Sequence, residues 1–320
     1  MQKQEALYMN TYLRNKPPWV QLIIFLGLTG GIWALVIFGG AYVVAFANGL
    51  SPFQVASMSA KDYAKPELVN VVRGMLIVQF LMFVLPPLVF AYLADPRPMG
   101  YIGLKAPDKK HFLFWGIVII VFAFLMVEWL YLVNQELVNH LGKAVKQWIE
   151  NGESEKDDTI GNIVNMKNFG DFLLSVLFVG VLAAVGEEIF FRGILQRLFI
   201  QLFRSPWSGI IFTGAIFSAI HGQFMGFIPR MILGVILGAL YWYSGSILTA
   251  IIGHFVFNSI TLFLIYFKLA DMESKAVLNT FNTLVGIGSL AVVIFLLNYL
   301  RKQSVTSYEG MFLHDEKVDS

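Results

Sequence analysis

Cysteine is absent from the 320-residue sequence, which excludes a thiol nucleophile, thiolate ligands for a metal ion and any disulfide framework. Charged residues are also scarce at 14%, whereas hydrophobic residues make up 57% and the mean hydropathy is +0.67. These values lie outside the range of an ordinary soluble globular domain, so the sequence predicts an integral membrane protein. The net charge is +2, and the sequence contains no basic stripe of the kind that binds nucleic acid.

Long apolar runs indicate how often the chain crosses the bilayer. Strand patterns of about ten alternating residues are lacking, and backbone amides in lipid are satisfied only by helices or closed barrels. We therefore expect an all-α bundle of about eight transmembrane helices, with residues 1–320 as a single membrane domain. Six runs approach the ~20 residues that cross ~30 Å of hydrocarbon, and two shorter runs complete the set: 20–47, 70–94, 112–134, 170–202, 246–267 and 279–300, then 208–221 and 228–243.

The basic residues predict the orientation of this bundle. Eight passes place both termini on one side, and the tails with the loops 95–111 and 197–204 hold twelve Lys and Arg residues. The opposite loops hold a similar number, but four of these lie in the long acidic segment 135–169, where the positive-inside rule is weak. We expect a cell-membrane protein with both termini in the cytoplasm and a disordered cytoplasmic tail at 303–320.

Three polar motifs interrupt the apolar segments. Ionisable groups in hydrocarbon cost roughly 2.5 to 3.5 kcal/mol each, so these side chains require partners or a function. Residues four apart share a helix face, so Glu188 can pair with Arg192 while the neighbouring Glu187 faces a cavity. The motifs are Glu187-Glu188-x-x-x-Arg192, Phe217-x-x-x-His221 and His254-x-x-x-Asn258.

Helix lengths indicate whether the motifs meet. Glu187 and His221 lie ~27 and ~24 Å from the turn near 204–206, at 1.5 Å per residue, and thus at similar depth. His254 lies only ~14 Å past the turn near Gly245, which leaves it ~10 Å short in straight vertical helices. The two intervening segments are short and are joined by a connection rich in Gly and Pro. We therefore expect a recessed, tilted hairpin whose tip lines a cavity and brings His221 toward His254.

A carboxylate and two imidazoles suit either of two hydrolytic designs. In the first, a general base deprotonates water. In the second, Glu187, His221 and His254 bind Zn²⁺, which lowers the pKa of a bound water to about 7. Both designs deliver a hydroxide-like nucleophile to a carbonyl group, and Asn258 can donate to the resulting oxyanion. Arg192 orients Glu188, although that pair alone is equally consistent with a structural lock.

The motifs of other intramembrane proteases are absent. The sequence contains no His-Glu-x-x-His of a site-2-type zinc protease, no Gly-x-Ser-Gly of a rhomboid and no Gly-x-Gly-Asp of a presenilin-like enzyme.

The three motifs, in this order and on successive helices, resemble the signature of the CPBP family of CAAX prenyl protease type II and bacteriocin-processing (Abi) membrane proteins. The resemblance covers about 170–267 and implies an eight-pass intramembrane endopeptidase with this segment as its catalytic core. It implies that the first glutamate activates water, that the second-motif histidine assists or ligates, and that the third-motif pair serves the oxyanion or a metal. The matching sequences are Glu187-Glu188-Ile189-Phe190-Phe191-Arg192, Phe217-Ser218-Ala219-Ile220-His221 and His254-Phe255-Val256-Phe257-Asn258.

The first hypothesis is therefore a CPBP-type endopeptidase acting on membrane-associated or prenylated-type peptides, at a cavity open to the cytoplasmic side. The second is a non-catalytic scaffold or bacteriocin-immunity-type protein that retains the motif. The third is a transporter of protons or metal ions, which the absence of inverted repeats disfavours. Glu128 either lines the cavity or lies near a helix end where water reaches it, and we favour the helix end.

Overall fold

The computed structural model describes residues 13, 16–58, 62, 65–147, 149, 166–269 and 278–316. Within these ranges the chain folds into helices and contains no strand, which confirms the predicted all-α class. Seven helices are long and apolar enough to cross a membrane. They are α2 (Pro18–Ala47), α5 (Val69–Ala94), α7 (His111–Asn139), the continuous helix Phe169–Phe203, α13 (Phe227–Ser244), α14 (Ile247–Tyr266) and α15 (Thr280–Gln303).

An eighth apolar helix, α12 (Pro206–Ile220), has 15 residues and is shorter than the ~20 needed to span hydrocarbon. Together these helices confirm the predicted multi-pass bundle.

The continuous helix changes its winding along its length. It consists of α9 (Phe169–Ser175), the π-helical η2 (Val176–Leu182), α10 (Ala183–Glu188), the π-helical η3 (Ile189–Gln196) and α11 (Arg197–Phe203). Wider π-helical turns inside α-helices are frequent at functional sites. Here they lie on both sides of the Glu187-Glu188 motif.

Local sequence signals define the central hairpins. The α12 helix begins at Pro206 behind Ser205, whose side chain accepts a hydrogen bond from the Ser208 amide. The α13 helix ends at Ser244 and is capped by Gly245, whose φ of 65° suits a residue without a Cβ. The next helix, α14, follows at once, with Ser246 as its N-cap. Only Gly245 and Ser246 therefore connect α13 to α14.

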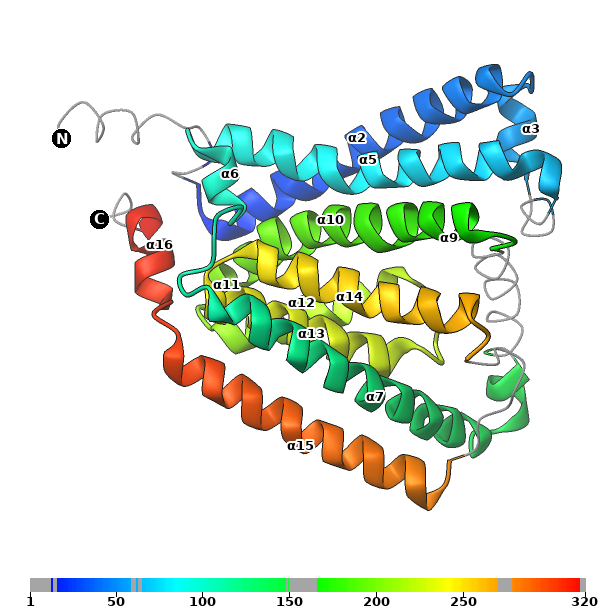
Figure 1. Ribbon diagram of the computed structural model, residues 1–320. Coiled ribbons are helices and arrows are strands. Elements are labelled where there is room, and N and C mark those ends of the chain that lie inside the picture. The colour runs from blue at the N-terminus through cyan, green and yellow to red at the C-terminus, as the bar shows by residue number, and fades with distance from the viewer. Residues whose placement is uncertain are drawn as a thin grey trace.

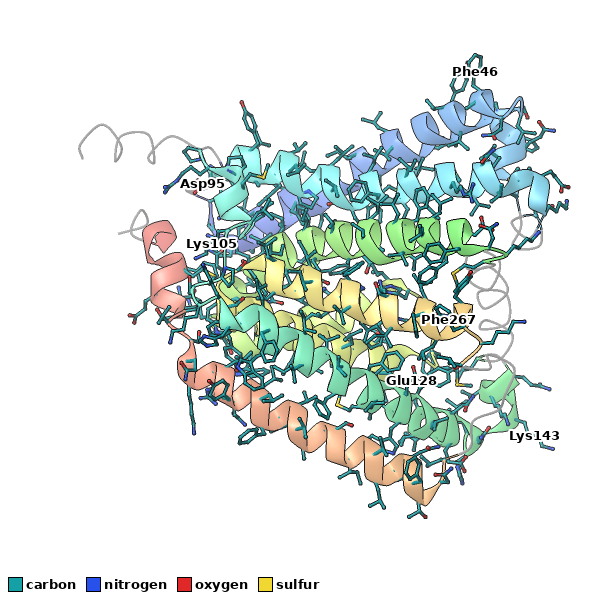
Figure 2. The ribbon with its side chains drawn as sticks, in the orientation of Figure 1. Phe46, Asp95, Lys105, Glu128, Lys143 and Phe267 are labelled. Carbon is teal, nitrogen blue, oxygen red and sulfur yellow. The ribbon has the colours of Figure 1, made fainter. Side chains whose placement is uncertain are left out.

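The helices run alternately in opposite directions, so the bundle has two faces (Figure 1). We call one the terminus face: it contains the start of α2, α6 (Pro98–Tyr101), the loop 102–110, the turns at 204–205 and 245–246, and α16 (Tyr308–Glu316). We call the other the opposite face: it contains α3 (Pro52–Ala56), η1 (Pro66–Leu68), the connection 221–226 and the end of α14. Figure 2 labels Asp95 and Lys105 near the terminus face, and Lys143 and Phe267 near the opposite face.

The C-terminal segment that we expected to be disordered contains α16. Its Phe312 side chain is fully buried and lies 4.9 Å from the Arg197 guanidinium, which also stacks over the Tyr101 ring at 4.2 Å. A buried aromatic residue and a cation–π contact thus dock this helix. Tyr308 and Met311 pack against the same core, so three apolar side chains at helical spacing hold α16 in place.

Candidate active site

A cavity of about 530 Å³ lies inside the bundle, lined by residues of α5, α7, η2, α10, α12, the 221–226 connection, α13 and α14. Four of the predicted site residues line it: Glu187, His221, His254 and Asn258. The other two, Glu188 and Arg192, lie behind its wall with no exposed surface. The structure therefore gathers all three motifs around one space, and as predicted the two glutamates face different surroundings.

The Glu188–Arg192 pair forms as predicted from the four-residue spacing. Arg192 Nη1 donates to Glu188 Oε1 at 2.9 Å, and Nη2 donates to the backbone carbonyl of Gly234 at 2.9 Å. The guanidinium also lies 4.8 Å from the centroid of the Phe217 ring. A buried charge of this kind persists only when it is paired and hydrogen-bonded, and here Arg192 ties the first motif to α12 and α13.

His254 connects the two glutamates, a role that the sequence did not reveal. Its Nδ1 lies 2.9 Å from Glu188 Oε1, and its Nε2 lies 3.9 Å from Glu187 Oε2. A carboxylate at Nδ1 accepts a hydrogen bond from that N–H group and fixes the ring orientation, so Nε2 faces Glu187. Arg192, Glu188, His254 and Glu187 thus form a chain that leads from the core to the cavity.

His254 lies at the depth of Glu187, with their facing atoms 3.9 Å apart. Straight helices with a rise of 1.5 Å per residue would have left it ~10 Å short of that depth. The turn between α13 and α14 lies inside the protein, with Ser244 and Ser246 fully buried. It is covered by the loop 102–110, since the amide of Asp108 donates to the Ser244 carbonyl and the amide of Ile247 donates to the Gly103 carbonyl, both at 3.0 Å. Because α14 starts beneath this cover, His254 reaches the depth of Glu187.

The second-motif histidine is held by its own helix. His221 Nδ1 lies 2.7 Å from the carbonyl oxygen of Phe217, and the two rings are 5.1 Å apart. With its proton on Nδ1, the ring carries a lone pair on Nε2. Phe217 also contacts the His254 ring at 5.9 Å, so this aromatic side chain separates the two imidazoles and sets their positions.

Asn258 lies on the cavity wall one turn after His254. Its Nδ2 donates to the carbonyl of Val179 in η2 at 2.9 Å, which uses one of the two amide hydrogens. The side chain therefore fixes α14 against the π-helical turn and keeps one N–H for another acceptor.

The tip of the α12–α13 hairpin lines the cavity, as predicted. Ser218 Oγ donates to the Phe227 carbonyl at 2.7 Å across the tip, and Asn134 Nδ2 on α7 donates to the Met225 carbonyl at 2.7 Å. Gly222 has a φ of 61°, which lets the chain turn directly after His221. These bonds hold the connection over the cavity.

Glu128 also lines the cavity, and not the helix end that we favoured. It lies on α7 about 16 Å before the last residue, at 1.5 Å per residue, so the helix carries it well into the bundle. Figure 2 shows it in the half of α7 that leads to the opposite face.

The role of Glu187, His221 and His254 as Zn²⁺ ligands stays a prediction. Among the residues that the structure describes, which include Glu187, His221 and His254, no three His, Asp or Glu side chains are placed to hold a metal ion together. Both ring nitrogens of His254 face glutamates, and Nδ1 is occupied by Glu188. The geometry instead presents a carboxylate and an imidazole at a cavity wall.

One comparison with known proteins finds a family match over the region that contains the three motifs. Residues 169–260 match the family described as type II CAAX prenyl endopeptidase Rce1-like. The match covers less than a third of the chain but includes all three motifs, and it confirms the predicted resemblance to the CPBP family of CAAX-type membrane proteases. No curated protein and no solved structure matches the chain.

Proposed function

We propose, from the similarity of residues 169–260 to type II CAAX prenyl endopeptidases, that this protein is an intramembrane endopeptidase in which Glu187 activates water. The observation that carries the proposal is the chain of contacts from Arg192 through Glu188 and His254 to Glu187 at the cavity wall. Its substrate is a membrane-associated peptide or protein segment that enters the cavity from the lipid or the aqueous boundary.

The spacing of Glu187 and His254 suits one bridging water. Their facing atoms are 3.9 Å apart, which is too long for a direct hydrogen bond. A water molecule placed beside this gap can contact both atoms at about 2.8 Å. Glu187 then accepts a proton from the water, and the oxygen adds to the peptide carbonyl carbon.

The contacts of His254 support this assignment. The proposed reaction uses His254 with a proton on both nitrogens, because Nδ1 faces Glu188 at 2.9 Å and Nε2 faces Glu187 at 3.9 Å; Arg230 lines the same cavity as a further cation. In that state His254 Nδ1–H is held by Glu188 while Nε2–H points into the cavity. The Nε2–H group and the second amide hydrogen of Asn258 then stabilise the oxyanion of the tetrahedral intermediate.

Collapse of the intermediate returns the proton. Glu187, protonated by the water, donates to the leaving amide nitrogen as the carbon–nitrogen bond breaks, which yields a carboxylic acid and an amine. We assign to His221 Nε2 the role of accepting a hydrogen bond from the second O–H of the attacking water. The contact of Nδ1 with the Phe217 carbonyl orients the lone pair of Nε2 for this role. No step requires a metal ion.

A comparison of membrane peptides tests the proposal. Cells carrying the wild-type protein, Glu187→Gln or the control Glu136→Gln are grown in parallel, and peptides of their membrane fractions are quantified by mass spectrometry. Glu136 is an exposed carboxylate at the end of the same α7 helix that carries Glu128, so its variant controls for charge alone. Peptides formed by the wild type and Glu136→Gln should be lost with Glu187→Gln, and identical peptide sets in all three strains would refute the proposal.

A further inference from the structure

The cavity occupies one half of the bundle. Its lining residues come from the first half of α5, the second half of α7, the segment from η2 to α10, the end of α12, the start of α13, and the middle and end of α14. Each of these stretches lies between mid-depth and the opposite face, because successive helices reverse direction (Figure 1). The cavity therefore extends from Glu187 and His254 toward the opposite face.

The other half of the bundle is filled with protein. All residues from 186 to 201 are buried on every side of their helix, and so are all residues from 236 to 247. The loop 102–110 adds a cover, because its backbone is bonded to the α13–α14 turn through Ser244 and Ile247. A substrate has no route from the terminus face through the residues that the structure describes.

The opening is instead marked by partly exposed residues of the opposite face. Gln223, in the 221–226 connection, lines the cavity and is half-buried, while its neighbour Phe224 is 52% exposed. On the facing wall, Tyr131 of α7 lines the cavity and is 37% exposed. Both walls thus reach the surface of the protein on this side.

The two faces hold similar numbers of basic residues but differ in their distribution. On the opposite side, four Lys residues lie in the long acidic segment 135–169, where the positive-inside rule is weak, and the shorter connections 48–68 and 267–279 hold Lys61, Lys65, Lys268 and Lys275. The 221–226 connection beside the cavity contains no Lys or Arg. Short loops rich in Lys and Arg remain in the cytoplasm. The terminus-face connections after α5 and α11 and the end of α15 hold seven such residues: Arg97, Lys105, Lys109, Lys110, Arg204, Arg301 and Lys302.

We infer that the cavity opens to the extracytoplasmic side of the membrane and takes peptides presented from that side, such as secreted peptides or outer segments of membrane proteins. The inference rests on the proposed function for its substrate. It replaces the expectation of a cytoplasmic opening, because termini in the cytoplasm and a cavity at the opposite face place the two on different sides of the bilayer. A cytoplasmic prenylated protein is then not the substrate.

The absence of cysteine makes the orientation directly measurable, since each introduced cysteine is the single thiol of the chain. The variants are Lys105→Cys at the terminus face, Lys143→Cys at the opposite face and Gln223→Cys at the cavity, with Tyr131→Cys as a second cavity position. Lys105 and Lys143 are both exposed and are labelled in Figure 2. A membrane-impermeant maleimide is applied to intact cells and, separately, to permeabilised cells.

We expect Lys143→Cys, Gln223→Cys and Tyr131→Cys to react in intact cells, and Lys105→Cys only after permeabilisation. Reaction of Lys105→Cys in intact cells without reaction of Lys143→Cys would overturn the orientation. Cavity cysteines that react together with Lys105→Cys, or that stay unreactive in both conditions, would overturn the opening. Labelling needs no catalysis, so the same pattern in a Glu187→Gln background separates this inference from the proposed function.

Discussion

The buried Glu188–Arg192 pair gives the sharpest prediction about how stability and activity separate. In Arg192→Met, Glu188 keeps its contact with His254 but loses the bond from Nη1, and the Gly234 carbonyl loses the bond from Nη2. Removing one partner of a buried ion pair leaves an uncompensated charge and costs about 3 to 5 kcal/mol. Glu188→Met strands the Arg192 guanidinium in the same way and should cost a similar amount.

The double variant Glu188→Met with Arg192→Met should recover most of that loss. Apolar side chains of similar volume replace buried ion pairs with little or no cost, so we expect the double variant within about 2 kcal/mol of the wild type. Activity should not return, because His254 Nδ1 still lacks its carboxylate partner. The assays are thermal unfolding of the purified protein in detergent and formation of the Glu187-dependent peptides.

Two results would refute this reasoning. If the two single losses of stability add in the double variant, Glu188 and Arg192 are not coupled as the 2.9 Å contact requires. If the double variant is as active as the wild type, Glu188 does not orient His254 for the reaction. A surface pair supplies the control: breaking Lys65–Asp62, which is exposed, should change stability by less than about 1 kcal/mol.

Three further predictions concern the cavity wall. Asn258→Leu removes both the bond to Val179 and the proposed oxyanion donor, so the rate of peptide formation should fall about 10²-to-10³-fold; a rate near that of the wild type would remove Asn258 from the reaction. Glu128→Leu replaces a carboxylate that makes no hydrogen bond or ion pair with the residues that the structure describes, so the free energy of unfolding should rise by up to about 2.5 kcal/mol, and a drop in unfolding temperature would reveal a partner for Glu128. Metal analysis of the purified wild type, His221→Ala and His254→Ala should show equally low zinc in all three, whereas stoichiometric zinc lost in either variant would establish the alternative metal mechanism.

Much of the fold followed from elementary constraints on the sequence. Bilayer thickness sets the length of apolar helices, so the runs in the sequence located each of the seven long spans found among the described residues. The four-residue spacing of Glu188 and Arg192 predicted their contact, because a helix brings those positions together. The arrangement of Gly and Pro between Gly222 and Pro229 likewise predicted a hairpin tip at the cavity.

The sequence could not reveal contacts that depend on where helices end in space. The depth of His254 depends on the burial of the Gly245 turn beneath the loop 102–110, and that burial arises from backbone bonds between distant segments. The pairing of His254 with Glu188 follows from the same displacement. The periodicity of the sequence does not predict contacts of this kind, so helix length alone gave a wrong depth for His254 relative to Glu187.

Two smaller features were not predicted from the sequence for related reasons. Helix α16 docks through Phe312 against Arg197, which is a contact between one residue and a helix more than a hundred positions away. The bond from Asn258 to Val179 depends on a π-helical turn, and η2 has the same apolar composition as an ordinary transmembrane helix. In both cases the partner is a distant side chain or a backbone carbonyl, and composition does not identify such a partner.

The central claim is that the Glu187 carboxylate accepts the proton of the attacking water, and Glu187→Gln tests it most directly, because the amide keeps the size of the side chain and removes the base. The measurement is the rate at which purified protein forms one of the peptides identified in the membrane comparison, with unfolding temperature recorded on the same samples. General-base catalysis typically contributes 10²-to-10⁴-fold, so the account predicts a loss of at least about 10²-fold with an unchanged unfolding transition. A folded Glu187→Gln protein that forms the peptide within a few-fold of the wild-type rate would contradict it.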